Sequence, residues 1–189
     1  GGTAWVTLEP CPHTGRTGPC ADALVEAGIA RVVVAIEDPD PRASGAGIRR
    51  LREAGIDVTV GEQAEAVRQQ LTPYLKHRTT GRPWVVLKLA ASIDGRTAAP
   101  DGSSQRSTGG AAQADAHQLR AESDAIVVGA GTVRTDDPSL NVRHVEGRDP
   151  LRVVLGTAPP GAKVHPALQF QGELEDLLDE LGNRGILQV

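Results

Sequence analysis

The sequence predicts an α/β protein in which parallel strands are covered by helices. Strand and helix signals alternate along the chain, and this repeated β-α-β spacing is typical of parallel sheets with right-handed crossovers. Aromatic residues make up only 2% of the 189 residues, so a core must be built from Val, Leu, Ile and Ala, as such sheets favour. With 39% hydrophobic and 23% charged residues, the composition excludes collagen-like, disordered and membrane-spanning classes.

The first half contains clear strand and helix signals. Apolar, β-branched runs predict three strands, over residues 3–8, 31–36 and 56–60. Helical periodicity predicts three helices: residues 20–27, a helix through Ile48, Leu51 and Arg52 that stops at Gly55, and residues 62–75. Glycine ends the first two of these helices, as expected for a helix C-terminus.

A second α/β half follows a polar segment that contains Gly and Pro. We place the domain boundary in this segment, with residues 1–76 as the first domain, 77–83 as a linker and 84–189 as the second domain. Three strands are predicted in the second domain, over residues 84–91, 125–128 and 151–155. Two helices are predicted there, over residues 110–122 and 173–181, and a further strand is expected to begin at 185–189.

Composition also limits the class of function. The net charge of −4 and the lack of basic runs argue against nucleic-acid binding and favour a small-molecule substrate. No apolar run approaches the roughly 20 residues of a membrane helix, and no leader opens the chain, so we expect a cytoplasmic protein. The chain has no Met, and we expect it to be part of a longer protein.

Two cysteines flank the loop after the first strand. Cys11 follows Pro10 directly, and Cys20 opens the next helix. Zinc and a helix N-terminus both stabilise a thiolate, so zinc binding is one interpretation; burial of two small apolar side chains is the other. A catalytic zinc needs a third protein ligand, for which His13 is a local candidate. Pro-Cys with a second Cys at a helix start matches the second half of the zinc-deaminase pattern, although its usual spacing is Cys-x-x-Cys.

A Gly-x-Gly turn directly follows a predicted strand in the second domain. Backbone amides of Gly129 and Gly131 can meet a dinucleotide phosphate there, and a tight strand-to-helix turn without a ligand is the alternative. The third glycine of the dinucleotide fingerprint is replaced by Arg134, which disfavours an ordinary Rossmann assignment.

The first domain resembles the deaminase half of the bifunctional riboflavin-biosynthesis deaminase-reductase family. The resemblance is carried by the segments 7–11, 18–24, 31–35 and 38–41. It implies a cytidine-deaminase-like three-layer fold with Cys11 and Cys20 as zinc ligands. It also implies four contacts to a pyrimidine ribotide: His13, Arg16, Asp38 and Asp40. The family's zinc histidine and catalytic glutamate are expected before Gly1, and Glu9 is expected to be structural.

The second domain resembles the reductase half of the same family. The matching segments are 88–96, 115–121, 129–133 and 136–143. The resemblance implies a dihydrofolate-reductase-like fold and NADPH, bound along Ala90, Thr132, Asp136 and Thr157. It places Ser104, Arg120, Leu140 and Arg143 on the ribose-phosphate side of the ribotide, with Lys88 and Asp94 as further candidates. Two guanidinium groups can grip a phosphate by bidentate hydrogen bonds, although each arginine alone could form only a surface ion pair.

Three departures from the family pattern stand in this domain. Arg106 replaces a tryptophan that usually contacts the cofactor, and we expect its guanidinium to reach the NADPH phosphate instead. Phe170 and Gln171 join regions between which the family has an additional strand and loop. The family's Glu-Gly-Gly stretch is expected after Val189.

The resemblance implies a bifunctional enzyme of riboflavin biosynthesis. Its zinc domain deaminates a diamino-pyrimidinone ribotide, and its second domain reduces the ribosylamino group to ribitylamino with NADPH. We expect homo-oligomers, because the sheets would otherwise leave open edges, and no nucleic-acid or membrane partner. The alternatives are a reductase with a remnant deaminase half and a non-catalytic ribotide-binding module. A polynucleotide deaminase is disfavoured by the acidic balance and the long cysteine spacing.

Overall fold

The computed structural model describes residues 1–99 and 108–189. The chain divides into two compact units, unit 1 (Gly1–Thr80) and unit 2 (Gly81–Val189). Each unit has its own parallel three-stranded sheet, so the expected α/β class is confirmed. Among the described residues, no helix is long and apolar enough to cross a membrane.

The sheet of unit 1 has the strand order β1-β2-β3. Its strands are β1 (Thr3–Leu8), β2 (Arg31–Ile36) and β3 (Asp57–Val60), and all pairs are parallel. Five of the six residues of β2 are buried, as expected for the central strand of a sheet. The boundaries of β1 and β2 agree with those predicted from the sequence.

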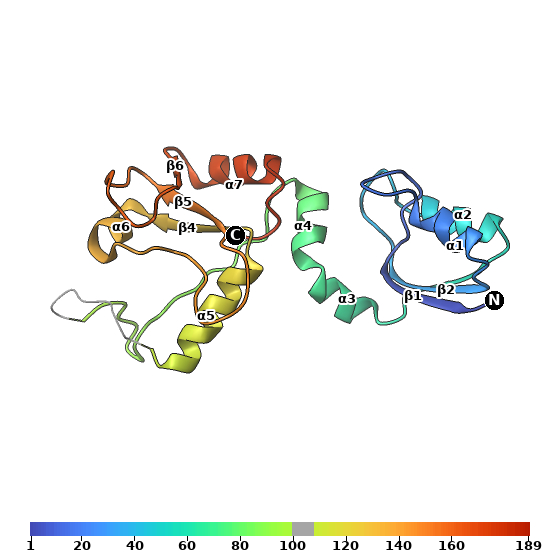
Figure 1. Cartoon of the computed structure of the whole chain (residues 1–189), viewed down its shortest axis with the longest axis horizontal. Helices are drawn as coiled ribbons and strands as arrows, with labels where there is room; N and C mark the ends of the chain where they lie inside the picture. The colour runs from blue at the N-terminus through green and yellow to red at the C-terminus, as the bar shows by residue number, and fades with distance from the viewer. Residues whose placement is uncertain (100–107) are drawn as a thin grey trace. The chain divides into compact units, whose positions relative to one another are not determined.

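Helices α1 (Cys20–Glu26) and α2 (Ala46–Glu53) cover one face of this sheet (Figure 1). The β-branched side chains of β2 that point to this face pack against apolar side chains spaced one helical turn apart on α2. The buried core between sheet and helices consists of Ala21, Val32, Val34, Ile48, Leu51 and Ile56. Each fully buried Val or Leu contributes roughly 1.5–3 kcal/mol of transfer free energy.

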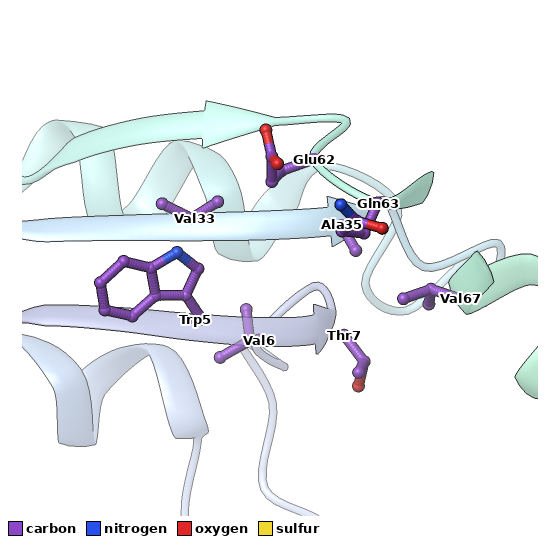
Figure 2. Close-up of a pocket in the computed structure, with 8 residues that line it drawn as sticks. All are labelled: Trp5, Val6, Thr7, Val33, Ala35, Glu62, Gln63 and Val67. Carbon is purple, nitrogen blue, oxygen red and sulfur yellow. The ribbon is translucent and has the colours of Figure 1, made fainter. Parts of the chain in front are cut away.

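The opposite face of the sheet is only partly covered. Val67 of helix α3 (Ala64–Gln70) packs near Ala35 at the carboxyl end of β2. Trp5 lies on the same face and is 72% exposed. Figure 2 shows Trp5 and Val33 beside an open, mainly apolar hollow on this face. The expected three layers are therefore met only in part within the described residues of unit 1.

The prediction of a single helix over residues 62–75 is wrong. The structure has α3 and a second helix, α4 (Thr72–Thr80), separated at Leu71. Pro73 explains the break, because proline lacks the N–H that a helix interior needs but is tolerated in the first turn. Helix α4 also runs through the first four residues of the segment 77–83, which was expected to be a linker.

The sheet of unit 2 has the strand order β4-β5-β6, again with parallel pairs. Its elements, in chain order, are α5 (Gly110–Glu122), β4 (Ala125–Gly129), α6 (Ala130–Asp136), β5 (Leu151–Leu155), β6 (Leu168–Phe170) and α7 (Leu174–Asn183). Helix α7 packs Leu177 and Leu181 against Val153 of β5, and α6 packs Val133 in the cluster that contains Val154. Figure 1 shows α6 directly after β4.

Two expectations for unit 2 are corrected by the structure. The strand expected over 84–91 is reduced to an isolated parallel bridge between Trp84 and Gln188, because described residues beyond Val86 find no ladder partner. The segment 185–189, expected to begin a strand, supplies that bridge. The strand β6 was not predicted; it pairs with β5, and residues 171–173 connect it to α7.

Candidate functional site

The two cysteines of unit 1 lie together at the start of α1. The backbone N–H of Cys20 points to Sγ of Cys11 at 3.4 Å, and the N–H of Ala21 donates to the carbonyl of Cys11 at 3.1 Å. Both thiols are free. The pKa of the Cys20 thiol is raised, chiefly by a hydrogen bond to the side chain of Cys11, then by burial, and then by the charge of Cys11.

This thiol pair does not complete a zinc site with its described neighbours. Among the described residues, no group of three or more His, Cys, Asp or Glu side chains is placed to hold a metal ion. His13, a candidate third ligand, is half-buried, and its Nδ1 atom has no hydrogen-bond partner within residues 1–99 and 108–189. A catalytic zinc needs three protein ligands, so the two cysteines fit only part of that set.

Glu9 fixes the strand end that carries Cys11. Its side chain is 3% exposed. Oε2 accepts the N–H groups of Asp38 at 3.2 Å and Gly45 at 2.8 Å, and Oε1 accepts those of Gly47 at 2.8 Å and Ile48 at 3.1 Å. The carboxylate thus satisfies free donors at the N-terminus of α2, which has no cap from its own side chains. The expected structural role of Glu9 is confirmed by these bonds.

The two aspartates expected at the ribotide are both buried and bonded within unit 1. Both carboxylate oxygens of Asp38 accept from Tyr74 Oη at 3.0 Å. Asp40 pairs with Arg42 at 2.7 Å and with Arg78 at 3.7 Å. Hydrogen bonds from the side chain and backbone of Arg42 hold the pKa of Asp40 far below its ordinary value, and the charge of Arg78 adds to this. Arg16, the fourth ribotide candidate, is exposed on the loop between β1 and α1.

Unit 2 brings together two of the expected ribotide-binding residues in a basic cluster. We define this basic cluster as Arg120 and Arg143; the rings of His117 and His144 lie beside it. Arg120 Nη1 donates to the carbonyl of Asn141 at 2.6 Å and lies 3.3 Å from Nδ1 of His117. The backbone N–H of Arg143 donates to the same Nδ1 atom at 3.0 Å.

No described carboxylate forms a salt bridge with either arginine of the cluster, whereas four other described arginines of unit 2 do: Arg82, Arg96, Arg152 and Arg184. Arg143 Nη1 donates instead to neutral oxygens of Ser139 and Asn141. Nε of Arg120 is buried without a hydrogen-bond partner among the described residues. Burial and the charge of Arg143 lower the pKa of Arg120, against the opposing effect of Asp149. Two cations held close together with an unsatisfied buried donor are suited to bind an anion.

The loop that carries Arg143 has an unusual backbone. Asp137, Leu140 and His144 all have positive φ angles, of 42°, 52° and 55°. Such angles cost free energy in residues other than glycine, so the surrounding structure must hold them in place. The side chain of Leu140 is buried in the core beside α6, and this packing anchors the loop to the core.

Candidate NADPH residues gather at the carboxyl edge of the unit 2 sheet. β4 and β5 are parallel and paired up to Gly129 and Leu155, so the segments that follow them start at the same edge. Thr132 is exposed on α6 after β4, and Thr157 is exposed after β5, where its Oγ1 accepts from Gln171 at 3.1 Å. Gly156, with φ +97°, lets these segments approach, because a Cβ there would lie 3.1 Å from Cβ of Ala130. Asp136, one helical turn after Thr132, is half-buried at the end of α6.

The remaining candidates of unit 2 are not part of these two groups. Ala90 is half-buried and Lys88 is exposed in the extended segment after Trp84. Ser104 and Arg106 lie outside the described residues.

Sequence reasoning missed His117, His144, Ser139 and Asn141. A signal for His117 was present, because it precedes Arg120 by three residues on a predicted helix and therefore shares its face. The other three lie in the loop 137–144, whose conformation has no periodic pattern. Their contacts depend on backbone angles that the sequence does not display.

A family profile described as the RibD C-terminal domain matches residues 83–189, which is more than half of the chain. The chain belongs to the RibD family. The resemblance identified from the sequence is thereby confirmed.

Individual RibD proteins match beyond the region of the family profile. The riboflavin biosynthesis protein RibD of Chlamydia trachomatis is 50% identical over 171 residues, which cover 87% of this chain and 46% of that protein. RibD of Escherichia coli is 45% identical over 186 residues, covering 92% of this chain and 51% of that protein. The chain therefore spans about half the length of these curated relatives.

Solved RibD structures share the fold. One structure of Acinetobacter baumannii RibD covers 99% of this chain and 61% of its own, with 40% identity and a TM-score of 0.91. A Thermotoga maritima protein, titled a diaminohydroxyphosphoribosylaminopyrimidine deaminase/5-amino-6-(5-phosphoribosylamino)uracil reductase, also covers 99% of this chain and 60% of its own. Its identity is 34% and its TM-score 0.88.

Proposed function

We propose that unit 2 belongs to a reductase of riboflavin biosynthesis that acts on a phosphorylated pyrimidine ribotide with NADPH. The observation that carries this proposal is the basic cluster. The side chains of Arg120 and Arg143 both donate to Asn141, and neither has an ion-pair partner among the described residues; Arg120 Nε is buried without a hydrogen-bond partner there. Family membership supports the reaction class, and the cluster supports a phosphorylated substrate.

In this proposal the arginines hold the phosphate and thereby fix the sugar. Guanidinium donors bind phosphate oxygens in a bidentate manner, which orients the group as well as attracting it. Leu140 would contribute its backbone, because its side chain is buried in the core. Lys88 and Ser104 are proposed as further ribotide contacts. Fixing the phosphate limits the positions that the reacting sugar carbon can adopt.

The proposed cofactor side is the carboxyl edge of β4 and β5. Exposed hydroxyl groups of Thr132 and Thr157 and the open space beside Gly131 fit a bound dinucleotide there. Asp136, Ala90 and Arg106 are proposed further contacts. When bound, NADPH supplies the hydride for reduction of the ribosylamino group to ribitylamino.

We also propose the finer assignment of the two units. Residues 84–189 are part of a dihydrofolate-reductase-like domain, residues 1–76 are part of a cytidine-deaminase-like domain, and 77–83 connect them. The match of nearly the whole chain to RibD structures supports this assignment. We further propose that the enzyme is cytoplasmic and homo-oligomeric and that it has no nucleic-acid or membrane partner.

Zinc-dependent deamination is the second proposed function, and the proximity of Cys11 and Cys20 favours it. Among the described residues, no group of three or more His, Cys, Asp or Glu side chains is placed to hold a metal ion; the third ligand and the catalytic glutamate of this proposal are the histidine and glutamate that the family resemblance implies. His13, Arg16, Asp38 and Asp40 are proposed on the ribotide side of that site. Zinc content of the intact gene product, compared with its Cys11→Ala variant, tests the metal assignment.

Turnover by the intact gene product tests both functions. The diamino-pyrimidinone ribotide is supplied with and without NADPH, and products are followed by mass spectrometry. Deamination without NADPH and a ribityl product with NADPH support both proposals. If only the deaminated ribotide is reduced, the zinc half is a remnant. If neither compound reacts, both proposed activities are wrong.

A further inference from the structure

His117 is a buried titratable residue for which the proposed reaction has no role. Its side chain is only 6% exposed, and it lies on the face of α5 that also carries Arg120. Its ring stands edge-on to that of His144, with centroids 4.8 Å apart. A buried imidazole between two arginines needs a reason, because burial beside cations disfavours its charged form.

The contacts of His117 determine its protonation state. Nδ1 faces the backbone N–H of Arg143 at 3.0 Å and Nη1 of Arg120 at 3.3 Å. Both groups are hydrogen-bond donors and neither can accept, so Nδ1 must carry a lone pair and the proton of the neutral ring sits on Nε2. Burial lowers the pKa of His117, and the charges of Arg120, Arg143 and His144 lower it further, which agrees with a neutral ring.

The three residues that follow Leu140 are each held through their backbone by a side chain. The carbonyl of Asn141 accepts from Arg120, the N–H of Val142 donates to Oδ1 of Asp149 at 2.8 Å, and the N–H of Arg143 donates to His117. The loop has positive φ angles on both sides of this stretch, at Leu140 and His144. These three bonds therefore hold a backbone that would relax without them.

We infer that His117 is a positioning residue: its Nδ1 atom holds the backbone of Arg143 so that the guanidinium of Arg143 meets the ribotide phosphate together with that of Arg120. This inference rests on the proposed function, because it assumes that the basic cluster binds the phosphate. His117 itself does not contact the substrate. It acts through the position of Arg143, and by its contact with Arg120 it ties the loop to α5.

Two amide substitutions separate this role from simple packing. His117→Asn places an oxygen acceptor close to the position of Nδ1, whereas His117→Gln carries the same chemical group one bond further out, near the position of Nε2. Neither amide titrates. Gln118→Asn, on the exposed side of the same helix, controls for a change of side chain on α5.

The measurement is kcat and KM of the intact gene product for the deaminated ribotide and for its dephosphorylated riboside. The ratio of kcat/KM for the two compounds reports the phosphate interaction alone. We expect His117→Gln to lower this ratio about tenfold, the value of one hydrogen bond, mainly through KM of the ribotide. His117→Asn and Gln118→Asn retain the ratio, and NADPH affinity is equal in all variants.

The possible outcomes distinguish the role of His117 from the proposed phosphate site. Loss in His117→Gln with rescue in His117→Asn supports the positioning role. Ratios unchanged in both variants, or lowered equally in both, overturn it while leaving the phosphate site intact. If the wild-type protein does not prefer the ribotide to the riboside, the phosphate site itself is wrong, and the role of His117 is overturned with it.

Discussion

The carbonyl oxygen of Pro10 lies against the α-carbon of Gly47: a Cβ added to Gly47 would stand 1.9 Å from that oxygen. Gly47 is in the first turn of α2, and its N–H donates to Glu9. The strand end that leads to Cys11 is therefore locked to the N-terminus of α2 by a close backbone approach that only glycine allows.

Gly47→Ala is expected to destabilise unit 1 by about 1–3 kcal/mol, because backbone atoms on both sides must move apart. Urea unfolding followed by circular dichroism measures this effect. Gly15→Ala is the matched control, since a Cβ at Gly15 has no atom within 4 Å. Equal unfolding midpoints for the two variants would contradict the contact.

Glu9→Gln is expected to lower the free energy of unfolding by about 1–3 kcal/mol. The substitution replaces one carboxylate oxygen with an NH2 group, which then faces N–H donors instead of accepting from them. Glu26→Gln, at an exposed position of α1, is the control and should unfold like the wild type. Denaturant unfolding of both variants measures this free energy. If Glu9→Gln unfolds with the same free energy as the wild type, the carboxylate is not needed for stability.

Strands and helices were predictable where burial gives the apolar residues a regular spacing along the sequence. The bounds of β1, β2 and β5 followed from apolar runs: β2 is buried along nearly its whole length, whereas the residues of β1 alternate between exposed and partly buried positions. β6 was missed because it is only three residues long and its pairing with β5 is a long-range contact. The strand predicted after Pro83 was wrong for a related reason. A strand forms only where a neighbouring strand supplies hydrogen-bond partners, and here the pairing is limited to an isolated bridge between Trp84 and Gln188.

The charged residues of the candidate site were predictable from the sequence, but the residues that contact and position them were not. The family resemblance placed Arg120 and Arg143 on the same phosphate, and in the structure both side chains donate to Asn141. The residues that hold them, His117 and Asn141, depend on a loop with positive φ angles that no sequence period encodes. Asp38 and Asp40 illustrate the converse limit, since their sequence spacing gives no sign of the partners Tyr74 and Arg78 on α4.

Asp40 should make the stability of unit 1 sensitive to acid. Its pKa in the folded state is lowered, chiefly by hydrogen bonds from Arg42, so the unfolded chain takes up a proton first, near the ordinary pKa of about 3.9. The stabilisation is present above that pH and is lost as pH falls towards the lower folded-state pKa. Asp40→Asn should flatten the pH dependence below about pH 4. Asp57→Asn, which removes an exposed ion pair with Arg31, is the control and should keep the pH dependence of the wild type. Acid unfolding curves of equal steepness for the wild type and Asp40→Asn would contradict the prediction.

Replacing either arginine of the basic cluster should weaken binding of the ribotide. Arg120→Ala and Arg143→Ala each remove charge-assisted hydrogen bonds worth about 1.5–3 kcal/mol, which corresponds to a rise in KM of roughly 10- to 100-fold. Because a phosphate contact is made equally in the ground and transition states, kcat should change little. Arg120→Lys keeps the charge but not the planar fork, so its KM should fall between those of wild type and Arg120→Ala. Arg184→Ala removes an arginine of the same unit that pairs with Glu180, and it should leave KM unchanged. Steady-state kinetics of the intact gene product with NADPH in excess give these values, and equal KM values for Arg120→Ala and Arg184→Ala would exclude the basic cluster as the phosphate site.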